Sequence, residues 1–238
     1  MRIGILEADT LEPDIEEKYG SYAKMFQRLF QSVDKQVAFT VYRVIDDSYP
    51  DDIDECDAYL ITGSKFSAYD NVPWIIKLRH FIVELHKREK KLIGICFGHQ
   101  LIAHALGGHT QKSEKGWSVG NVMSDLQINT PWLGNATKPF SLLVSHQDQV
   151  ERLPEHAALI ASNESCKNSA YQLGDNILAF QGHPEFSNAY LKYLMAKRRD
   201  IIGKEKYNNA MDSLQQENDS KRVAQWLINF ISDNATVV

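Results

Sequence analysis

The fold of this chain is decided by the stretch Lys91-Leu92-Ile93-Gly94-Ile95-Cys96-Phe97-Gly98-His99-Gln100. Its first five residues have the composition of a buried strand. The segment from Gln100 to Leu106 has the composition of a helix. A cysteine between strand and helix, with glycines two positions before and after it, is typical of a nucleophile elbow in which Cys96 replaces the usual serine. The two glycines are expected where the sharp turn crowds its neighbours.

The helix that follows Cys96 would aim its first N–H groups and the positive end of its dipole at the sulfur. Both effects favour the thiolate, which is the reactive form of cysteine. The alternative is a structural cysteine buried at the end of a core strand. The flanking glycines and the immediate helix start favour the reactive interpretation.

Composition excludes several classes of protein. The 238 residues are 43% hydrophobic and 24% charged, which is typical of a globular protein with one large α/β domain or two small ones. The net charge is −5, and the sequence has no long run of either sign. It therefore does not predict the basic surface that binds nucleic acid or an anionic membrane. No apolar stretch is long enough for a membrane span. Three distant cysteines predict a reducing, cytoplasmic location and neither a disulfide framework nor a metal site.

Strands and helices alternate along the first hundred residues. This pattern predicts a mostly parallel open sheet with helices on both faces, in which sites form beyond the carboxyl ends of the strands. Gly63 and Cys96 both follow predicted strand ends, so we expect them to meet at this edge. The predicted strands are 2–7, 37–42, 58–62 and 91–95, and the predicted helices are 15–33 and one that begins at Pro73.

The middle and the end of the chain have a different character. Short β-like pieces at 119–123, 140–144, 157–161 and 177–181 predict added antiparallel or mixed strands. The tail, residues 187–233, is expected to be helical, with a polar helical excursion over 203–219. It serves either as a docking surface or as a cap on the sheet, and its apolar stripes favour the cap. We expect one domain over 1–238, with its core in about 1–190.

A cysteine nucleophile needs a base, and the base needs a group that orients it. Two of the eight histidines follow strand-like segments outside the elbow helix. His183 is followed two residues later by Glu185, which could hold the imidazole in one tautomer. His146 also follows a strand, so the residue pattern alone leaves both as candidates.

At this point the motifs resemble a known family. The elbow together with His183-Pro184-Glu185 resembles the class I glutamine amidotransferases. Ile61-Thr62-Gly63-Ser64, Lys115-Gly116-Trp117 and Ser145-His146-Gln147-Asp148 are similar to the branch that includes GMP synthase glutaminase domains. The resemblance covers roughly residues 40–190.

The resemblance implies a role for each matching residue. Cys96 would be the nucleophile, His183 the base and acid, and Glu185 the residue that orients His183. Backbone N–H groups near Gly63 and at Phe97 would form the oxyanion hole. The glutamine pocket would be lined by Gln100, Ser145, His146 and Gln147, so that His146 would not be the base. No metal or organic cofactor is implied.

The activity implied by the resemblance is hydrolysis of the glutamine γ-amide through a γ-glutamyl thioester, with ammonia passed to a synthase partner. The chain has no nucleotide-binding glycine loop and no room for a synthetase domain, so the partner would be separate. The alternative is a stand-alone γ-glutamyl peptidase, whose leaving group is a peptide amine. A non-catalytic binding module on the same fold is a second alternative.

Overall fold

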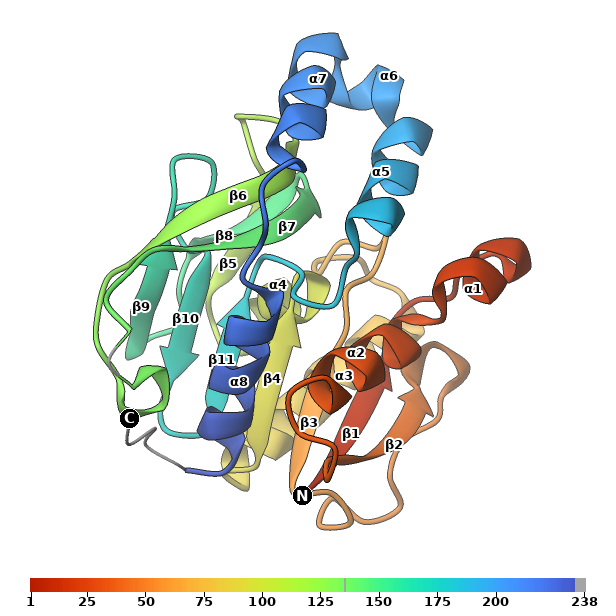
Figure 1. Ribbon diagram of the computed structural model, residues 1–238. Coiled ribbons are helices and arrows are strands. Elements are labelled where there is room, and N and C mark those ends of the chain that lie inside the picture. Colours follow the sequence, from red (N-terminus) through yellow and green to blue (C-terminus); the bar gives the residue numbers. More distant parts are fainter. Residues whose placement is uncertain (135, 234–238) are drawn as a thin grey trace.

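The computed structural model describes residues 1–134 and 136–233. Its main sheet has the strand order β2-β1-β3-β4-β11-β10-β9-β6-β7 among the described residues, and β5 and β8 form a separate antiparallel pair (Figure 1). The strands are β1 (Arg2–Glu7), β2 (Ala38–Arg43), β3 (Ala58–Ile61), β4 (Lys91–Ile95), β5 (His109–Lys112), β6 (Ser118–Leu126), β7 (Phe140–His146), β8 (Asp148–Arg152), β9 (Ala157–Ser162), β10 (Ala170–Leu173) and β11 (Ile177–Phe180).

The first five strands of this order are parallel, and the remaining four are antiparallel. The α/β fold with a mostly parallel sheet and added antiparallel strands is therefore confirmed. The register brings three carboxyl ends together, because Ile61 of β3 pairs with Gly94 of β4, and Ile95 pairs with Phe180 of β11. The segments that follow these three strands meet at one edge of the sheet.

Helices cover both faces of the sheet (Figure 1). Apolar side chains of α2 and α8 pack on one face, and those of α3 and α4 pack on the other. The helices are α1 (Pro13–Tyr19), α2 (Tyr22–Gln31), α3 (Pro73–Lys87), α4 (Phe97–Ala105), α5 (Asn188–Lys197), α6 (Arg199–Ile202), α7 (Lys204–Ser213) and α8 (Ser220–Ile231), with 3₁₀ turns η1 (Val44–Asp46) and η2 (Pro131–Leu133).

The prediction of one helix over 15–33 was wrong. The chain forms α1 and α2, which are separated at Gly20 and Ser21. Gly20 has φ 87° and ψ 161°, a backbone conformation that other residues rarely adopt, and Ser21 caps α2 through its hydroxyl, which accepts from Lys24 N. The periodic apolar positions run across the break, so periodicity alone could not reveal it.

The excursion predicted over 203–219 contains α7, as expected from its polar helical composition. Figure 1 shows α5, α6 and α7 above the carboxyl ends of the parallel strands, where α5 lies against β7. α8 then returns to the sheet and buries Val223, Trp226, Leu227 and Phe230. This part of the tail is thus a cap on the core. Within 1–134 and 136–233, no helix combines the length and apolarity that crossing a membrane requires.

Candidate active site

Cys96 lies at the turn between β4 and α4, as the elbow pattern predicts. Its backbone has φ 52° and ψ −98°, a left-handed conformation that is costly for a residue with a side chain. The turn is held because Cys96 N donates to Phe180 O (2.9 Å) and Cys96 O accepts from Gln100 N (3.0 Å). The first helical residue is Phe97 rather than the predicted Gln100, so the helix begins directly after the sulfur.

The two glycines beside Cys96 sit where a side chain would not fit. A Cβ at Gly94 would lie 2.6 Å from Ile102 Cδ1 and 2.8 Å from the Gly98 carbonyl. A Cβ at Gly98 would lie 2.5 Å from Ile61 O. These distances are far below van der Waals contact, so the elbow can pack against β3 only because both positions lack a Cβ.

His183 follows β11 and lies beside both Gly63 and Cys96. The Gly63 backbone is so near that a Cβ there would be 2.8 Å from His183 Cε1. His183 N donates to Leu143 O of β7 (2.8 Å), which ties the loop to the antiparallel half of the sheet. The edge of the sheet therefore brings Gly63, Cys96 and His183 together from β3, β4 and β11.

Glu185 is the carboxylate partner of His183. Its Oε1 lies 2.7 Å from His183 Nδ1, and both side chains are almost fully buried. The imidazole also stacks on the ring of Phe186, with centroids 3.8 Å apart and planes 10° apart. These contacts fix the ring orientation and leave Nε2 as the nitrogen that does not face Glu185.

The electrostatics of this pair favour a protonated imidazole. Burial alone would lower the pKa of His183, but the charges of Glu185 and Cys96, with side-chain hydrogen bonds to both, raise this pKa to about 10. At neutral pH the ring then carries a positive charge beside the sulfur.

The other candidate base, His146, has a different environment. Its Nδ1 donates to the backbone carbonyl of Asp148 (3.0 Å) and not to a carboxylate. Burial lowers the pKa of His146 to about 4, so the ring is neutral at pH 7. Among the two histidines that the residue pattern left open, only His183 has a carboxylate to orient it.

An open cleft of about 260 Å³ lies over Cys96. The four residues predicted for the substrate pocket, Gln100, Ser145, His146 and Gln147, all line it. Gln100 Nε2 donates to Asp148 O (2.7 Å) and to Gln181 Oε1 (3.1 Å), so its amide is held by the wall of the cleft. The lining also includes Ser64, Lys65, Phe66, Ser67, Tyr69, Lys112, Trp117, Asp148 and Arg198.

None of these nine further lining residues was predicted as a pocket residue, and three of them, Asp148, Trp117 and Arg198, bear on the argument below. Asp148 and Trp117 stand inside the quoted motifs, so the signal that could have found them was their place beside predicted residues. Arg198 has no such signal, because it follows the last residue of α5 and reaches the cleft only through tertiary structure.

The structure offers no metal site in its described residues, where no group of three His, Cys, Asp or Glu side chains is arranged to hold an ion. The three cysteines are free and buried. Burial raises the pKa of Cys166 to about 12, which keeps that thiol protonated.

Comparison with known proteins supports the interpretation of the fold and motifs. The family model "Glutamine amidotransferase class-I" matches residues 15–198. Gamma-glutamyl peptidase 3 of Arabidopsis thaliana is 35% identical over 185 residues, which cover 74% of each chain. Gamma-glutamyl peptidase 2 of the same plant is 29% identical over 244 residues, which cover 99% of this chain and 97% of that protein.

The crystal structure of a glutamine amidotransferase from Thermotoga maritima shares the fold. Its TM-score is 0.75 at 18% sequence identity, with 98% of this chain and 96% of that chain covered. The chain belongs to the class I glutamine amidotransferase family.

Proposed function

We propose that this protein is a cysteine-dependent γ-glutamyl hydrolase that cleaves the γ-amide bond of γ-glutamyl compounds without a synthase partner. The observation that carries the proposal is the group formed by Cys96, which lines an open cleft at a strained elbow, and the buried His183–Glu185 pair beside it. The similarity to two γ-glutamyl peptidases, one of them over nearly the full chain, supports this substrate class.

The first half of the reaction forms an acyl-enzyme. The Cys96 thiolate attacks the γ-carbonyl carbon of the substrate, and a C–S bond forms. Backbone N–H groups near Gly63 and at Phe97 stabilise the negative oxygen of the tetrahedral intermediate, a contribution of about 3 kcal/mol per donor. The His183 imidazolium then gives its proton to the leaving nitrogen, the C–N bond breaks, and the amine departs.

The second half releases glutamate. Neutral His183 takes a proton from a water molecule, which attacks the γ-glutamyl thioester. The C–S bond breaks, and the sulfur leaves as a thiolate beside the imidazolium again. Glu185 orients the ring in both halves and stabilises its positive charge. No cofactor takes part in these steps.

Hydrolysis of free glutamine, with ammonia delivered to a synthase, is the second candidate. Membership of the class I glutamine amidotransferase family favours it, because the thioester chemistry is the same for both substrates. The two candidates differ in the leaving group and in the need for a partner.

One experiment separates them. Glutamate release by the purified protein alone is measured with glutamine and with a γ-glutamyl dipeptide in parallel, before and after treatment with iodoacetamide. We expect a higher kcat/KM for the dipeptide and loss of both activities after alkylation of Cys96. A preference for glutamine would favour the amidotransferase function, and slow alkylation without activity towards either compound would favour a non-catalytic module.

We further propose that residues 1–238 act as one domain in the cytoplasm. Two findings support this proposal: strands from the first and second halves of the chain share one sheet, and the three cysteines are free. Cell fractionation with an antibody to the chain tests the location, and enrichment in an organelle fraction would contradict it.

A further inference from the structure

Arg198 reaches the candidate active site from the end of α5. Its main chain is fixed on both sides, since Arg198 N donates to Leu194 O (3.1 Å) and Arg198 O accepts from Ile202 N (2.9 Å). The preceding residue, Lys197, forms an ion pair with Glu12 (2.7 Å), which attaches this end of α5 to the N-terminal part of the chain. The guanidinium is therefore carried by a well-anchored helix end and not by a loose loop.

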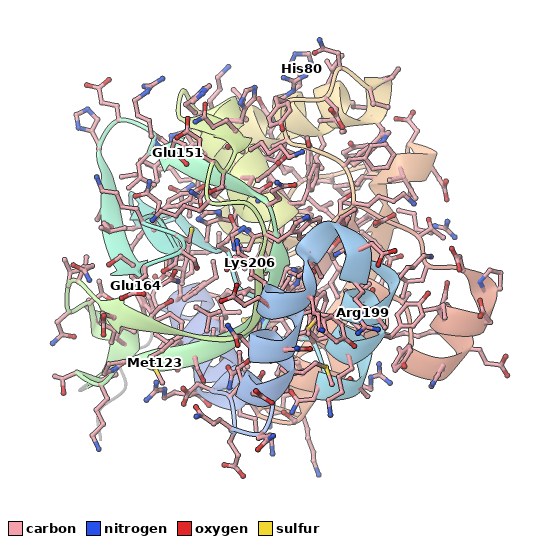
Figure 2. All side chains as sticks on the ribbon, turned by 90° about the horizontal axis from the view of Figure 1, so that it is seen from above. His80, Met123, Glu151, Glu164, Arg199 and Lys206 are labelled. Atoms are coloured by element: carbon pink, nitrogen blue, oxygen red, sulfur yellow. The ribbon has the colours of Figure 1, made fainter. Side chains whose placement is uncertain are left out.

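The guanidinium lines the cleft together with the two side chains that hold it. Arg198 Nη1 donates to Ser145 Oγ (2.8 Å), and its Cζ lies 5.3 Å from the ring centroid of Trp117. Lys206 of α7 (labelled in Figure 2) holds the Trp117 side of the cleft. Its Nζ donates to Trp117 O (3.1 Å) and to Lys115 O (2.5 Å). The guanidinium of Arg198 therefore holds a positive charge at a fixed place in the wall of the cleft.

No carboxylate of residues 1–134 or 136–233 forms an ion pair with Arg198. A guanidinium has five N–H donors, and the contact with Ser145 uses one of them. A half-buried arginine normally satisfies this fork with a carboxylate, often through two parallel hydrogen bonds. Here the free part of the fork lies at the wall of a cleft whose floor is Cys96.

The remaining charges of the cleft leave an excess of positive charge. Lys65 is neutralised by Asp9, with Nζ 3.1 Å from Oδ1. Lys112 has no carboxylate partner among the described residues, and Asp148, the single acidic residue of the lining, accepts a hydrogen bond from Ser67 Oγ (2.5 Å). Apart from the proposed Cys96 thiolate and His183 imidazolium, whose opposite charges offset each other, Arg198 and Lys112 outnumber Asp148, so the cleft suits a ligand with a net negative charge.

This excess distinguishes between the two substrate classes. Free glutamine carries one carboxylate and one ammonium group, so its charges balance. A γ-glutamyl amino acid or peptide carries a second carboxylate on the part that leaves. The net charge of such a substrate is −1, which matches the imbalance of the cleft.

Two contacts with β7 link Arg198 to the segment that carries His183. His183 N is bonded to Leu143 O, and the Arg198 side chain is bonded to Ser145, two residues along the same strand. Positions two apart on a strand are about 7 Å apart. The main chain of His183 and the side chain of Arg198 are therefore held by positions on β7 that are two residues apart.

We propose that Arg198 binds the carboxylate of the leaving amino acid or peptide, so that the preferred substrates are γ-glutamyl amides of amino acids with a free carboxylate. This inference rests on the proposed γ-glutamyl hydrolase function. Arg198 is then a specificity-determining residue, because glutamine and uncharged γ-glutamyl amides do not make this contact.

The test compares three substrates that differ in the leaving group: γ-glutamylglycine, γ-glutamylglycinamide and glutamine. We expect the wild-type protein to prefer γ-glutamylglycine over its amide by roughly 10- to 100-fold in kcat/KM, the range of a hydrogen-bonded charge pair. Arg198→Gln should abolish this preference and leave kcat/KM for the other two substrates within about threefold. Arg198→Lys, which keeps the charge without the fork, should retain part of the preference.

Arg199→Gln is the matched control, because Arg199 (labelled in Figure 2) is the next residue, is exposed, and contacts Tyr207 outside the cleft. It should leave the preference unchanged. An equal fall in kcat/KM for all three substrates in Arg198→Gln would overturn the proposal, since it would place Arg198 on the γ-glutamyl carboxylate or in a structural role. A preference that survives in Arg198→Gln would overturn it as well.

Calorimetry with the Cys96→Ala protein separates this inference from the proposed function. Tighter binding of γ-glutamylglycine than of γ-glutamylglycinamide, lost in the Cys96→Ala/Arg198→Gln double variant, supports the carboxylate site even if the wild-type protein hydrolyses neither compound. Equal binding of the two compounds by Cys96→Ala overturns the inference, even if the wild-type protein hydrolyses both.

Discussion

Replacement of Gly63 by alanine is expected to slow the reaction by displacing His183. The new Cβ would lie 2.8 Å from His183 Cε1, which is 0.6 Å short of the 3.4 Å at which ordinary contact begins. The ring cannot retreat freely, because Phe186 stacks on it at 3.8 Å and Glu185 holds its Nδ1 at 2.7 Å. The imidazole must therefore shift by several tenths of an ångström relative to Cys96.

A misplacement of about 1 Å in a catalytic group can lower the rate by roughly 100-fold, so a shift of several tenths of an ångström is expected to lower it by roughly 10-fold. The backbone at Gly63 does not have a positive φ, so alanine adds no backbone strain there. The N–H group that we assign to the oxyanion hole is also kept. We expect kcat to fall by about one order of magnitude, with little change in KM, in a glutamate-release assay.

Gly4→Ala is the control for crowding without a catalytic effect. A Cβ at Gly4 would lie 2.6 Å from two ring carbons of Tyr59, so this variant is as crowded as Gly63→Ala, but Gly4 lies inside β1 and pairs with Tyr59 of β3 rather than following a strand end. It should lower the melting temperature and leave kcat unchanged at temperatures where it is folded. A kcat for Gly63→Ala within threefold of the wild-type value would refute the assignment of His183 as the proton carrier.

Three further predictions concern the elbow and the ion pair. Cys96→Ala should abolish glutamate release and leave the melting temperature within a few degrees, and residual turnover would contradict the thioester mechanism. Glu185→Gln should lower kcat more than it raises KM. The folded state raises the pKa of His183 from 6.5 to about 10, so protonation of this ring stabilises the protein fully below pH 6.5, and this stabilisation is lost as the pH rises towards 10. The melting temperature of Glu185→Gln should fall less over this pH range than that of the wild-type protein. An equal fall would show that Glu185 does not cause the pKa shift. Gly98→Ala should destabilise the protein by about 1–3 kcal/mol, or about 2–12 °C, because its Cβ would lie 2.5 Å from Ile61 O; an unchanged thermal unfolding curve would contradict this packing argument.

The parts of the site that could be predicted from the sequence are those carried by local patterns. The strand, the cysteine and the flanking glycines follow one another in the chain, so residues 91–100 indicate the elbow and the face on which it opens. His183 and Glu185 are two residues apart, so their pairing could also be proposed from the sequence, and the structure brings them within hydrogen-bonding distance.

The parts that could not be predicted depend on tertiary structure. Arg198 reaches the cleft because α5 lies against β7, a contact between segments about fifty residues apart. The β5–β8 pair was missed because its polar residues, such as Gln111 and Gln149, lack the apolar alternation of a half-buried strand. The helix break at Gly20 was missed since apolar spacing continues across it.

The two faces of the sheet are completed at different times during protein synthesis. The face covered by α3 and α4 has most of its apolar residues once about residue 105 has left the ribosome. The opposite face receives Val223, Trp226 and Phe230 from α8 only when nearly the whole chain has been made. Exposed apolar surface promotes aggregation of incomplete chains, and the face that α8 covers stays partly exposed until the end of translation. We therefore expect chaperones to bind the α2 side of the sheet during synthesis and to dissociate once α8 covers it.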